Sequence, residues 1–213
     1  MAVVGAGIYG KHHINAYLHN PDVELVALCD NSVERCHAAA NELGIPGYAS
    51  LSALLDKQQV DIISVATSDP FHKEPALQAI AQGKHVLIEK PAGDLGRRLR
   101  GDYCSRRGAR GDRRRRLSQA LGPGGAPRAH GGTEGGKRQD PARYINMDDV
   151  IAVPTEWLTW SAQSSPVWFL GSHCFDLVRY ISGQEVKSVY AVGQKRLLAS
   201  KGLDTWDSVQ STS

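Results

Sequence analysis

The sequence predicts an α/β fold, with a doubly wound parallel sheet in its N-terminal part followed by a partial α+β substrate domain. Apolar runs of strand length alternate with amphipathic helical segments through the first ninety residues, and a glycine-rich turn follows the first run. An aromatic segment that contains a histidine begins near Tyr144. We therefore expect three parts, at residues 1–93, 94–140 and 141–213.

The opening MAVVGAGIYGKHH places an apolar, β-prone run before three glycines spaced Gly-x-Gly-x-x-Gly, and a helix is expected directly after them. In such a Rossmann turn the first glycine permits the bend, the second lets the backbone approach a pyrophosphate, and the third lets the helix pack on the strand. The helix N-terminus adds free N–H groups and a positive dipole. We therefore expect a dinucleotide to bind at Gly5, Gly7, Ile8, Tyr9 and Gly10.

A second expected strand, VELVALCD, ends at Asp30, twenty residues after the last glycine of the turn. A carboxylate at this place can accept hydrogen bonds from the ribose hydroxyls of adenosine, and it would repel a 2′-phosphate. The predicted cofactor is therefore NAD rather than NADP. The alternative is a sheet of the same kind that binds no dinucleotide.

The alternation of helices and strands then repeats. The expected segments are, in order, a helix at 32–44, a short strand at 47–50, a helix at 51–58, a strand at 60–67, a helix at 72–83 and a strand at 84–91. Continuous apolar strands between amphipathic helices indicate a parallel sheet covered on both faces, in which ligands bind at the carboxyl ends of the strands. Thr67, His72, Glu89 and Lys90 fall at or just beyond such ends and are expected cofactor contacts. Thr67 or one of the two residues after it can equally cap the next helix.

The glycine turn, the segment VATSDPFHKEPALQAIAQGKHVLIEKP and above all Glu89-Lys90-Pro91 resemble the Gfo/Idh/MocA oxidoreductases, over residues 1–92. The resemblance implies an NAD(P)-dependent dehydrogenase that transfers hydride between nicotinamide and a sugar or polyol hydroxyl. It also implies that Lys90 lies near the nicotinamide and the substrate hydroxyl as a catalytic or positioning group, and that Pro91 is a cis proline. A lysine at a strand end is otherwise a solvated terminus.

From about Tyr144 the chain resembles part of the second domain of that family. A helix there carries an Asp-x-x-x-His element, and its histidine is implied to act with the lysine as acid or base at the reacting hydroxyl. The matching residue is His173, but Phe169 stands where the resemblance implies an aspartate. Asp176, three residues further along the expected helix, could partner the histidine. The alternative role for His173 is structural, at the start of a helix.

Residues 94–138 differ from both flanks, because they contain no Val, Ile, Met, Phe or Trp. Twelve arginines and Lys137 against four acidic residues give this segment a net charge of +9, in a chain whose net charge is +3. We interpret it as a frameshifted stretch, because the frame displaced by one base can be read as a helix followed by a strand. The chain also ends at Ser213, earlier than the resemblance implies, so we expect a truncated protein of impaired activity.

Composition excludes several classes of protein. A chain of 213 residues with 41% hydrophobic content is typical of a soluble globular protein, and neither a membrane span nor a secretion signal is expected, so the predicted location is cytoplasmic. The spacing of Cys29, Cys36, Cys104 and Cys174 suits neither a zinc site nor a disulfide scaffold, and no metal is predicted.

The expected partner is a small-molecule sugar or polyol, and the resemblance implies a homo-oligomer for the intact family. Little aromatic interleaving in the basic segment argues against nucleic-acid binding. Three alternatives stay open: a non-catalytic dinucleotide-binding protein, a protein tethered to nucleic acid by the basic segment, and a scaffold subunit that pairs with an intact homologue through residues 144–200.

Overall fold

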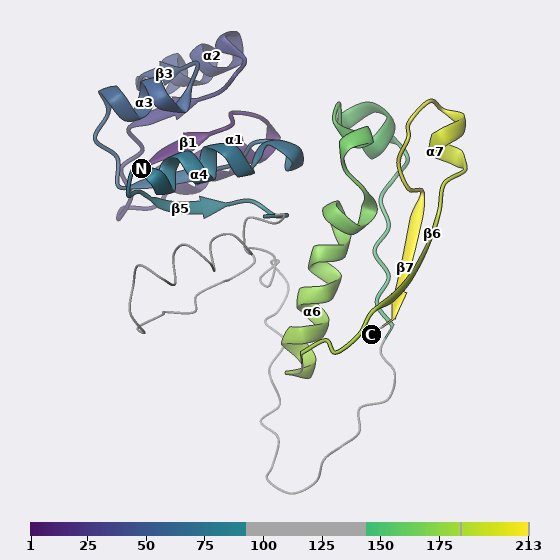
Figure 1. The fold of residues 1–213 in the computed structure, drawn as a ribbon. Coiled ribbons are helices and arrows are strands. Elements are labelled where there is room, and N and C mark those ends of the chain that lie inside the picture. The colour runs from purple at the N-terminus through teal and green to yellow at the C-terminus, as the bar shows by residue number, and fades with distance from the viewer. Residues whose placement is uncertain (93–143, 184, 213) are drawn as a thin grey trace, which may run out of the picture. The chain divides into compact units, whose positions relative to one another are not determined.

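The computed structural model describes residues 1–92, 144–183 and 185–212. Its contacts divide the chain into two compact units, Met1–Arg106 and Arg107–Ser213 (Figure 1). Each unit has its own secondary structure and is described by itself. The segment at 94–140 that we interpret as frameshifted lies outside the described residues, so that interpretation stays a prediction.

The first unit contains a five-stranded sheet in which every neighbouring pair of strands is parallel. Its strands are β1 (Ala2–Val4), β2 (Ala27–Cys29), β3 (Gly47–Tyr48), β4 (Ile62–Val65) and β5 (His85–Ile88). Their order across the sheet is β3-β2-β1-β4-β5, so the chain first builds outward from β1 on one side and then returns to build on the other. This reversal beside β1 defines a doubly wound sheet, and the predicted fold class is confirmed.

Four helices connect these strands: α1 (Ile8–Leu18), α2 (Val33–Leu43), α3 (Leu51–Lys57) and α4 (Lys73–Ala81), the last preceded by the 3-10 turn η1 (Asp69–Phe71). Helix α2 shows why they begin and end where they do. The hydroxyl of Ser32 accepts a hydrogen bond from the N–H of Arg35 at 3.3 Å, which caps its first turn. Gly44 then ends the helix in the left-handed conformation, with φ of 66°.

The core lies on both faces of the sheet, because alternate residues of a strand point to opposite faces. Ala2 and Val4 of β1 pack on one face with side chains of α3 and α4, while Val3 packs on the other face with Ile14 of α1 and Cys36 of α2. The expected strand from residue 23 is shorter in the structure, since β2 begins only at Ala27, where β1 supplies a paired neighbour.

The second unit has an α+β composition. Its helices are α6 (Ser172–Ser182) and the short α7 (Leu197–Ser200), and β6 (Tyr190–Gln194) pairs with β7 (Ser208–Thr212) in antiparallel fashion. Between residues 144 and 171, three short turns precede α6: the π-helical η2 (Val153–Trp157) and η4 (Val167–Gly171), and the 3-10 turn η3 (Ser161–Gln163).

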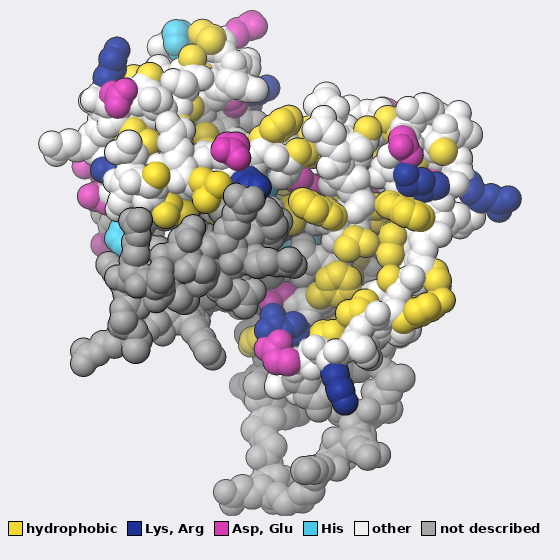
Figure 2. Space-filling model, in the orientation of Figure 1, with side chains coloured by type: hydrophobic (Ala, Val, Ile, Leu, Met, Phe, Trp, Pro, Cys, Tyr) yellow, Lys and Arg dark blue, Asp and Glu magenta, His cyan; other side chains and the backbone are white. Residues whose placement is uncertain are grey.

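Hydrophobic side chains gather on the surface of the second unit (Figure 2). The exposed ones include Trp168, Phe175, Tyr180, Ile181 and Tyr190. Contiguous exposed apolar surface of this kind is normally a contact surface. Within the described ranges, no helix is both long and apolar enough to cross a membrane.

Truncation of a central core side chain tests this arrangement. Ile63 lies on β4 between β1 and β5 and is fully buried, so Ile63→Ala should lower the free energy of unfolding of the first unit by about 2–5 kcal/mol. Urea unfolding of the full chain, followed by far-UV circular dichroism, measures this loss. Leu18→Ala is the control, since Leu18 is 53% exposed and its truncation should change stability by no more than about 0.5 kcal/mol. Equal urea midpoints for the two variants would contradict the placement of β4.

Candidate functional site

The carboxyl ends of four strands form one continuous edge of the first unit. Backbone hydrogen bonds continue across this edge, from the N–H of Gly5 to the carbonyl of Cys29 at 2.7 Å and from the N–H of Ala66 to the carbonyl of Val4 at 2.8 Å. The N–H of Glu89 donates in the same way to Val65 at 2.9 Å. The loops that leave β1, β2, β4 and β5 therefore begin side by side, where an open α/β sheet binds its ligands.

The turn after β1 depends on two glycines for steric reasons. Gly5 has a φ of +99°, and a Cβ added there would lie 2.6 Å from the carbonyl oxygen of Ala66. A Cβ at Gly10 would lie 1.8 Å from the carbonyl oxygen of Gly5. Both contacts are far inside van der Waals distance, so α1 can enter this close to the sheet only with glycine at both positions.

Gly7 lies in a different environment. It is the N-cap of α1, and a Cβ added to it would meet no atom within 4 Å. Because glycine has no side chain to cap the helix, it contributes no acceptor to the N–H groups of the first turn. Ile8 and Tyr9, which follow it, are 68% and 44% exposed. The turn thus presents backbone donors and the positive end of a helix dipole to open space.

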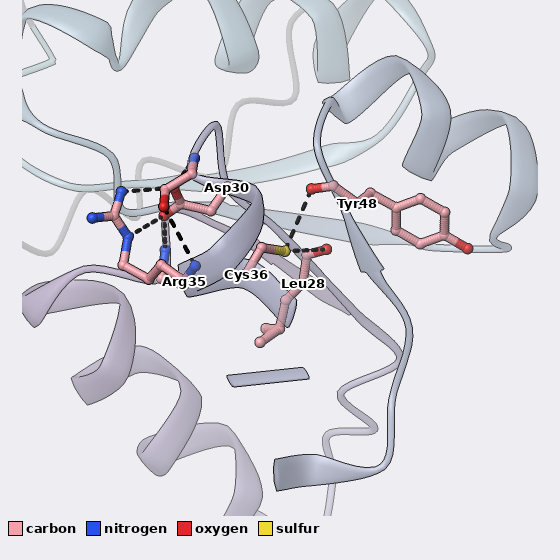
Figure 3. A network of polar contacts seen from close by, with 7 residues as sticks. Leu28, Asp30, Arg35, Cys36 and Tyr48 are labelled. Atoms are coloured by element: carbon pink, nitrogen blue, oxygen red, sulfur yellow. Dashed lines mark hydrogen bonds and ion pairs between the residues drawn. The ribbon is translucent and has the colours of Figure 1, made fainter. Parts of the chain in front are cut away.

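Asp30 follows directly after β2 and is only 5% exposed. Its Oδ2 accepts from the N–H of Ala6 at 2.7 Å, and its Oδ1 accepts from the N–H of Ser32 at 2.8 Å. Arg35 donates to both oxygens, from Nη2 to Oδ1 at 2.7 Å and from Nε to Oδ2 at 3.1 Å (Figure 3). Burial by itself raises the pKa of this carboxyl, but the hydrogen bonds from Arg35, Ala6 and Ser32 outweigh burial and hold the pKa below its ordinary value.

Arg35 is a residue of the site that the sequence analysis missed. It lies in the first turn of α2, where the helix dipole disfavours a cation. This unfavourable position of the positive charge is the signal in the sequence that could identify Arg35, because it indicates an anionic partner nearby. Its partner is Asp30, five residues earlier, and the guanidinium and the carboxylate form a two-pronged ion pair.

Glu89, at the end of β5, anchors a second polar network. Its Oε1 lies 2.7 Å from Nε2 of His13 on α1, whose Nδ1 lies 2.8 Å from the hydroxyl of Ser64 on β4. The hydroxyl of Tyr17 lies 2.9 Å from the same Ser64 oxygen. The hydrogen bond with His13 lowers the pKa of Glu89 and outweighs burial, which acts in the opposite direction. The carboxylate thereby ties α1 to the strand ends beside Lys90, whose N–H donates to Oε2 of Glu89 at 3.2 Å.

Thr67 and His72 also belong to this edge. The hydroxyl of Thr67 lies 3.0 Å from Nδ1 of His72, which is 3% exposed. Burial lowers the pKa of this histidine, so the neutral ring is favoured. Ser68 is the N-cap of η1 but makes no side-chain capping bond, and Thr67 pairs with the histidine, so the expected helix cap is not formed by either residue.

Lys90 directly follows Glu89, and the Lys90–Pro91 peptide bond is cis, which confirms the expectation for Pro91.

The thiols of Cys29 on β2 and Cys36 on α2 are both buried, and burial raises the pKa of Cys29 to about 12. A thiol with that pKa is not a nucleophile at neutral pH. Within the part of the chain that the structure describes, no group of three or more His, Cys, Asp or Glu side chains could hold a metal ion.

The predicted catalytic histidine belongs to the second unit. His173 is the second residue of α6, Phe169 lies in η4, and Asp176 lies one helical turn beyond His173 on α6. Lys90 and His173 are therefore on different units, and the structure places each within its own unit.

The comparisons with known proteins concern mainly the first unit. A family model described as "Oxidoreductase family, NAD-binding Rossmann fold" matches residues 1–94. D-glucoside 3-dehydrogenase of Escherichia coli is 36% identical over 93 residues, which cover 43% of this chain and 26% of that protein. A glycosyl hydrolase family 109 protein of Saccharopolyspora erythraea is 35% identical over 103 residues, which cover 44% of this chain and 22% of that protein. The matched part thus spans about a quarter of the length of these relatives.

Solved structures also resemble the fold of this chain. A "probable dehydrogenase" from Thermotoga maritima matches 99% of this chain and 63% of its own chain, with a TM-score of 0.61 and 20% sequence identity. This likeness concerns the fold alone. Residues 1–94 therefore resemble the NAD-binding domain of the Gfo/Idh/MocA oxidoreductases, through the family model, the glycine turn and the Glu89-Lys90-Pro91 element.

Proposed function

We propose that the first unit binds NAD(H) at the carboxyl edge of its sheet, and that the protein uses it to oxidise or reduce a sugar or polyol. One observation carries the proposal of binding. The space beside Gly7 is open, whereas glycines two and three residues away are packed against backbone. A turn with this pattern keeps room for a phosphate next to the helix N-terminus, and the residues present therefore fit a dinucleotide.

Each part of the cofactor has residues suited to hold it. The turn from Gly5 to Gly10, with Ile8 and Tyr9, would hold the pyrophosphate, and Asp30 would hold the ribose of adenosine. Thr67, His72, Glu89 and Lys90 would line the nicotinamide end. Their position supports this assignment, because ligands of an open parallel sheet bind at the carboxyl ends of its strands, and these residues follow the ends of β4 and β5.

A bound nicotinamide ring would accept or donate the hydride of the substrate carbon, and the protein must move the proton of the substrate hydroxyl. We assign that proton to Lys90, with His173 as the second acid or base. Glu89 supports Lys90, since its carboxylate accepts the backbone N–H of Lys90 and is itself fixed by His13. Phe169 stands in place of the implied aspartate, so this role of His173 does not depend on the aspartate that the resemblance implies.

The choice of reaction depends on the second unit. A dehydrogenase and a glycosyl hydrolase share similar identity with the first unit, so similarity there supports the cofactor more directly than the chemistry. The dehydrogenase reaction is favoured because Lys90 at the end of β5 is a group that can exchange a proton with a substrate hydroxyl. We include a homo-oligomer and a cytoplasmic location in this proposal. The exposed apolar side chains of the second unit support the homo-oligomer.

Substitution of Gly7 tests cofactor binding. Because a Cβ at Gly7 meets no protein atom, Gly7→Ala should fold as the wild type does, and its methyl group should occupy the space of the phosphate. We expect NADH affinity to fall by about tenfold or more, the size of one lost hydrogen bond to a charged group. Isothermal titration calorimetry measures the affinity, and thermal unfolding without NADH is the control for folding. Unchanged NADH affinity in a folded Gly7→Ala protein would contradict the placement of the phosphate.

Substitution of Lys90 tests the reaction. We expect Lys90→Met to bind NADH within about threefold of wild type, while kcat falls by roughly 10² to 10⁴, the usual contribution of an acid–base group. The assay is NADH formation at 340 nm with a panel of inositols, glucose and glucosides. An active Lys90→Met protein would refute the role of Lys90. A wild-type protein that binds NADH but hydrolyses a glucoside without oxidising any of the panel would replace the dehydrogenase proposal with a hydrolase.

Acid should destabilise the first unit through its two paired carboxylates. The pKa values of Asp30 and Glu89 are lowered by folding, so their pairing stabilises the protein above the unfolded values of about 3.9 and 4.3 and is lost as pH falls through the folded values. We expect the urea midpoint to drop from about pH 4 downward. Glu89→Gln should show a shallower drop, because it has one titrating group fewer. An equally steep drop in Glu89→Gln would show that the His13 pair contributes nothing to acid stability.

A further inference from the structure

We propose that Arg35 is a movable selectivity residue at the adenosine end of the site. It releases Asp30 when a dinucleotide binds, and its freed guanidinium then binds the 2′-phosphate of NADP(H), so that the site accepts NADPH as well as NADH. The inference rests on the proposed dinucleotide site, for which the sequence predicts NAD rather than NADP.

The acceptor positions of Asp30 are full. A carboxylate offers about four acceptor positions, two on each oxygen. Ala6 and Arg35 Nε occupy those of Oδ2, while Ser32 and Arg35 Nη2 occupy those of Oδ1. A ribose that donates its hydroxyls to Asp30 must therefore displace one of these donors.

Arg35 is the donor that can leave. The other two donors are backbone N–H groups, fixed by the turn before α1 and by the start of α2. The side chain of Arg35 is 49% exposed, against 4% for Asp30, so the guanidinium faces solvent on its outer side (Figure 3). A long flexible stem lets it swing away while remaining beside the same carboxylate, and an ion pair with one exposed partner is weakened by water.

The released group suits a phosphate better than a ribose. A guanidinium has only donors, arranged as a planar fork that matches phosphate oxygens, and it cannot accept the hydrogen bonds of hydroxyls. The paired Asp30 and Arg35 have no net charge, so the repulsion that an isolated carboxylate would exert on a 2′-phosphate is offset. NADH would thus be held by Asp30 after Arg35 has moved aside, and NADPH by Arg35 itself.

A purely structural role for Arg35 would have a different effect on the affinities for NADH and NADPH. If Arg35 only stabilises the start of α2, its removal should weaken both cofactors by the same factor through loss of order. If Arg35 is a selectivity residue, its removal should separate the two cofactors. The ratio of NADPH to NADH affinity therefore distinguishes the two roles.

The test titrates NADH and NADPH into the full chain by isothermal calorimetry, for the wild type, Arg35→Met and Arg35→Lys. We expect Arg35→Met to lose roughly tenfold or more in NADPH affinity, the effect of one lost charge-assisted contact, and to bind NADH at least as tightly as wild type. Arg35→Lys keeps the charge without the fork, so its NADPH-to-NADH ratio should lie between the other two. This variant keeps the test valid if Arg35→Met does not fold, as judged by circular dichroism.

The matched control is Arg179→Met, which removes an arginine that pairs with Glu185 in the second unit and should change neither affinity. Parallel losses of NADH and NADPH affinity in Arg35→Met, or a wild type that binds NADH alone, would overturn the role of Arg35 and leave the proposed function intact. A wild type that binds neither cofactor would overturn both.

Discussion

The close approach of backbone at Gly5 and Gly10 is the constraint on which the first unit depends. It brings the start of α1 against the end of β1, and the end of β1 against the residue that follows β4. Once α1 enters at this distance, Gly7 faces open space and the N–H of Ala6 points at Asp30. The phosphate side and the ribose side of the proposed site are thus set by one steric requirement.

Paired polar groups then hold the strand ends in place. Asp30 joins the glycine turn to α2, Glu89 joins β5 to α1 through His13, and Thr67 joins the end of β4 to His72. Buried polar groups are costly unless they are hydrogen-bonded, so a network of this kind fixes one arrangement of the loops. The same bonds lower the pKa values of Asp30 and Glu89 below their ordinary values.

The sequence predicts the sheet well because its signals are local. Strand-length apolar runs and the glycine spacing each act within a few residues, and the structure has the corresponding elements. His13 was not found, because its partners Ser64 and Glu89 are 51 and 76 residues away and no spacing rule links them. Arg35 is not predicted for another reason: the spacing of Asp30 from the glycine turn predicts its contact with ribose alone, whereas the positive charge of Arg35 opposes the dipole of α2 and indicates an anionic partner nearby. The role of His173 depends on the other unit, which local patterns do not place.

We propose that the carboxyl edge of the first unit is a preformed dinucleotide site, and hydrogen–deuterium exchange of the full chain with and without NADH measures whether it binds the cofactor. We expect slower exchange at residues 5–11, 30–35 and 66–73 when NADH is present, and unchanged exchange at residues 190–212. Unchanged exchange across the glycine turn, or protection confined to the second unit, would contradict it.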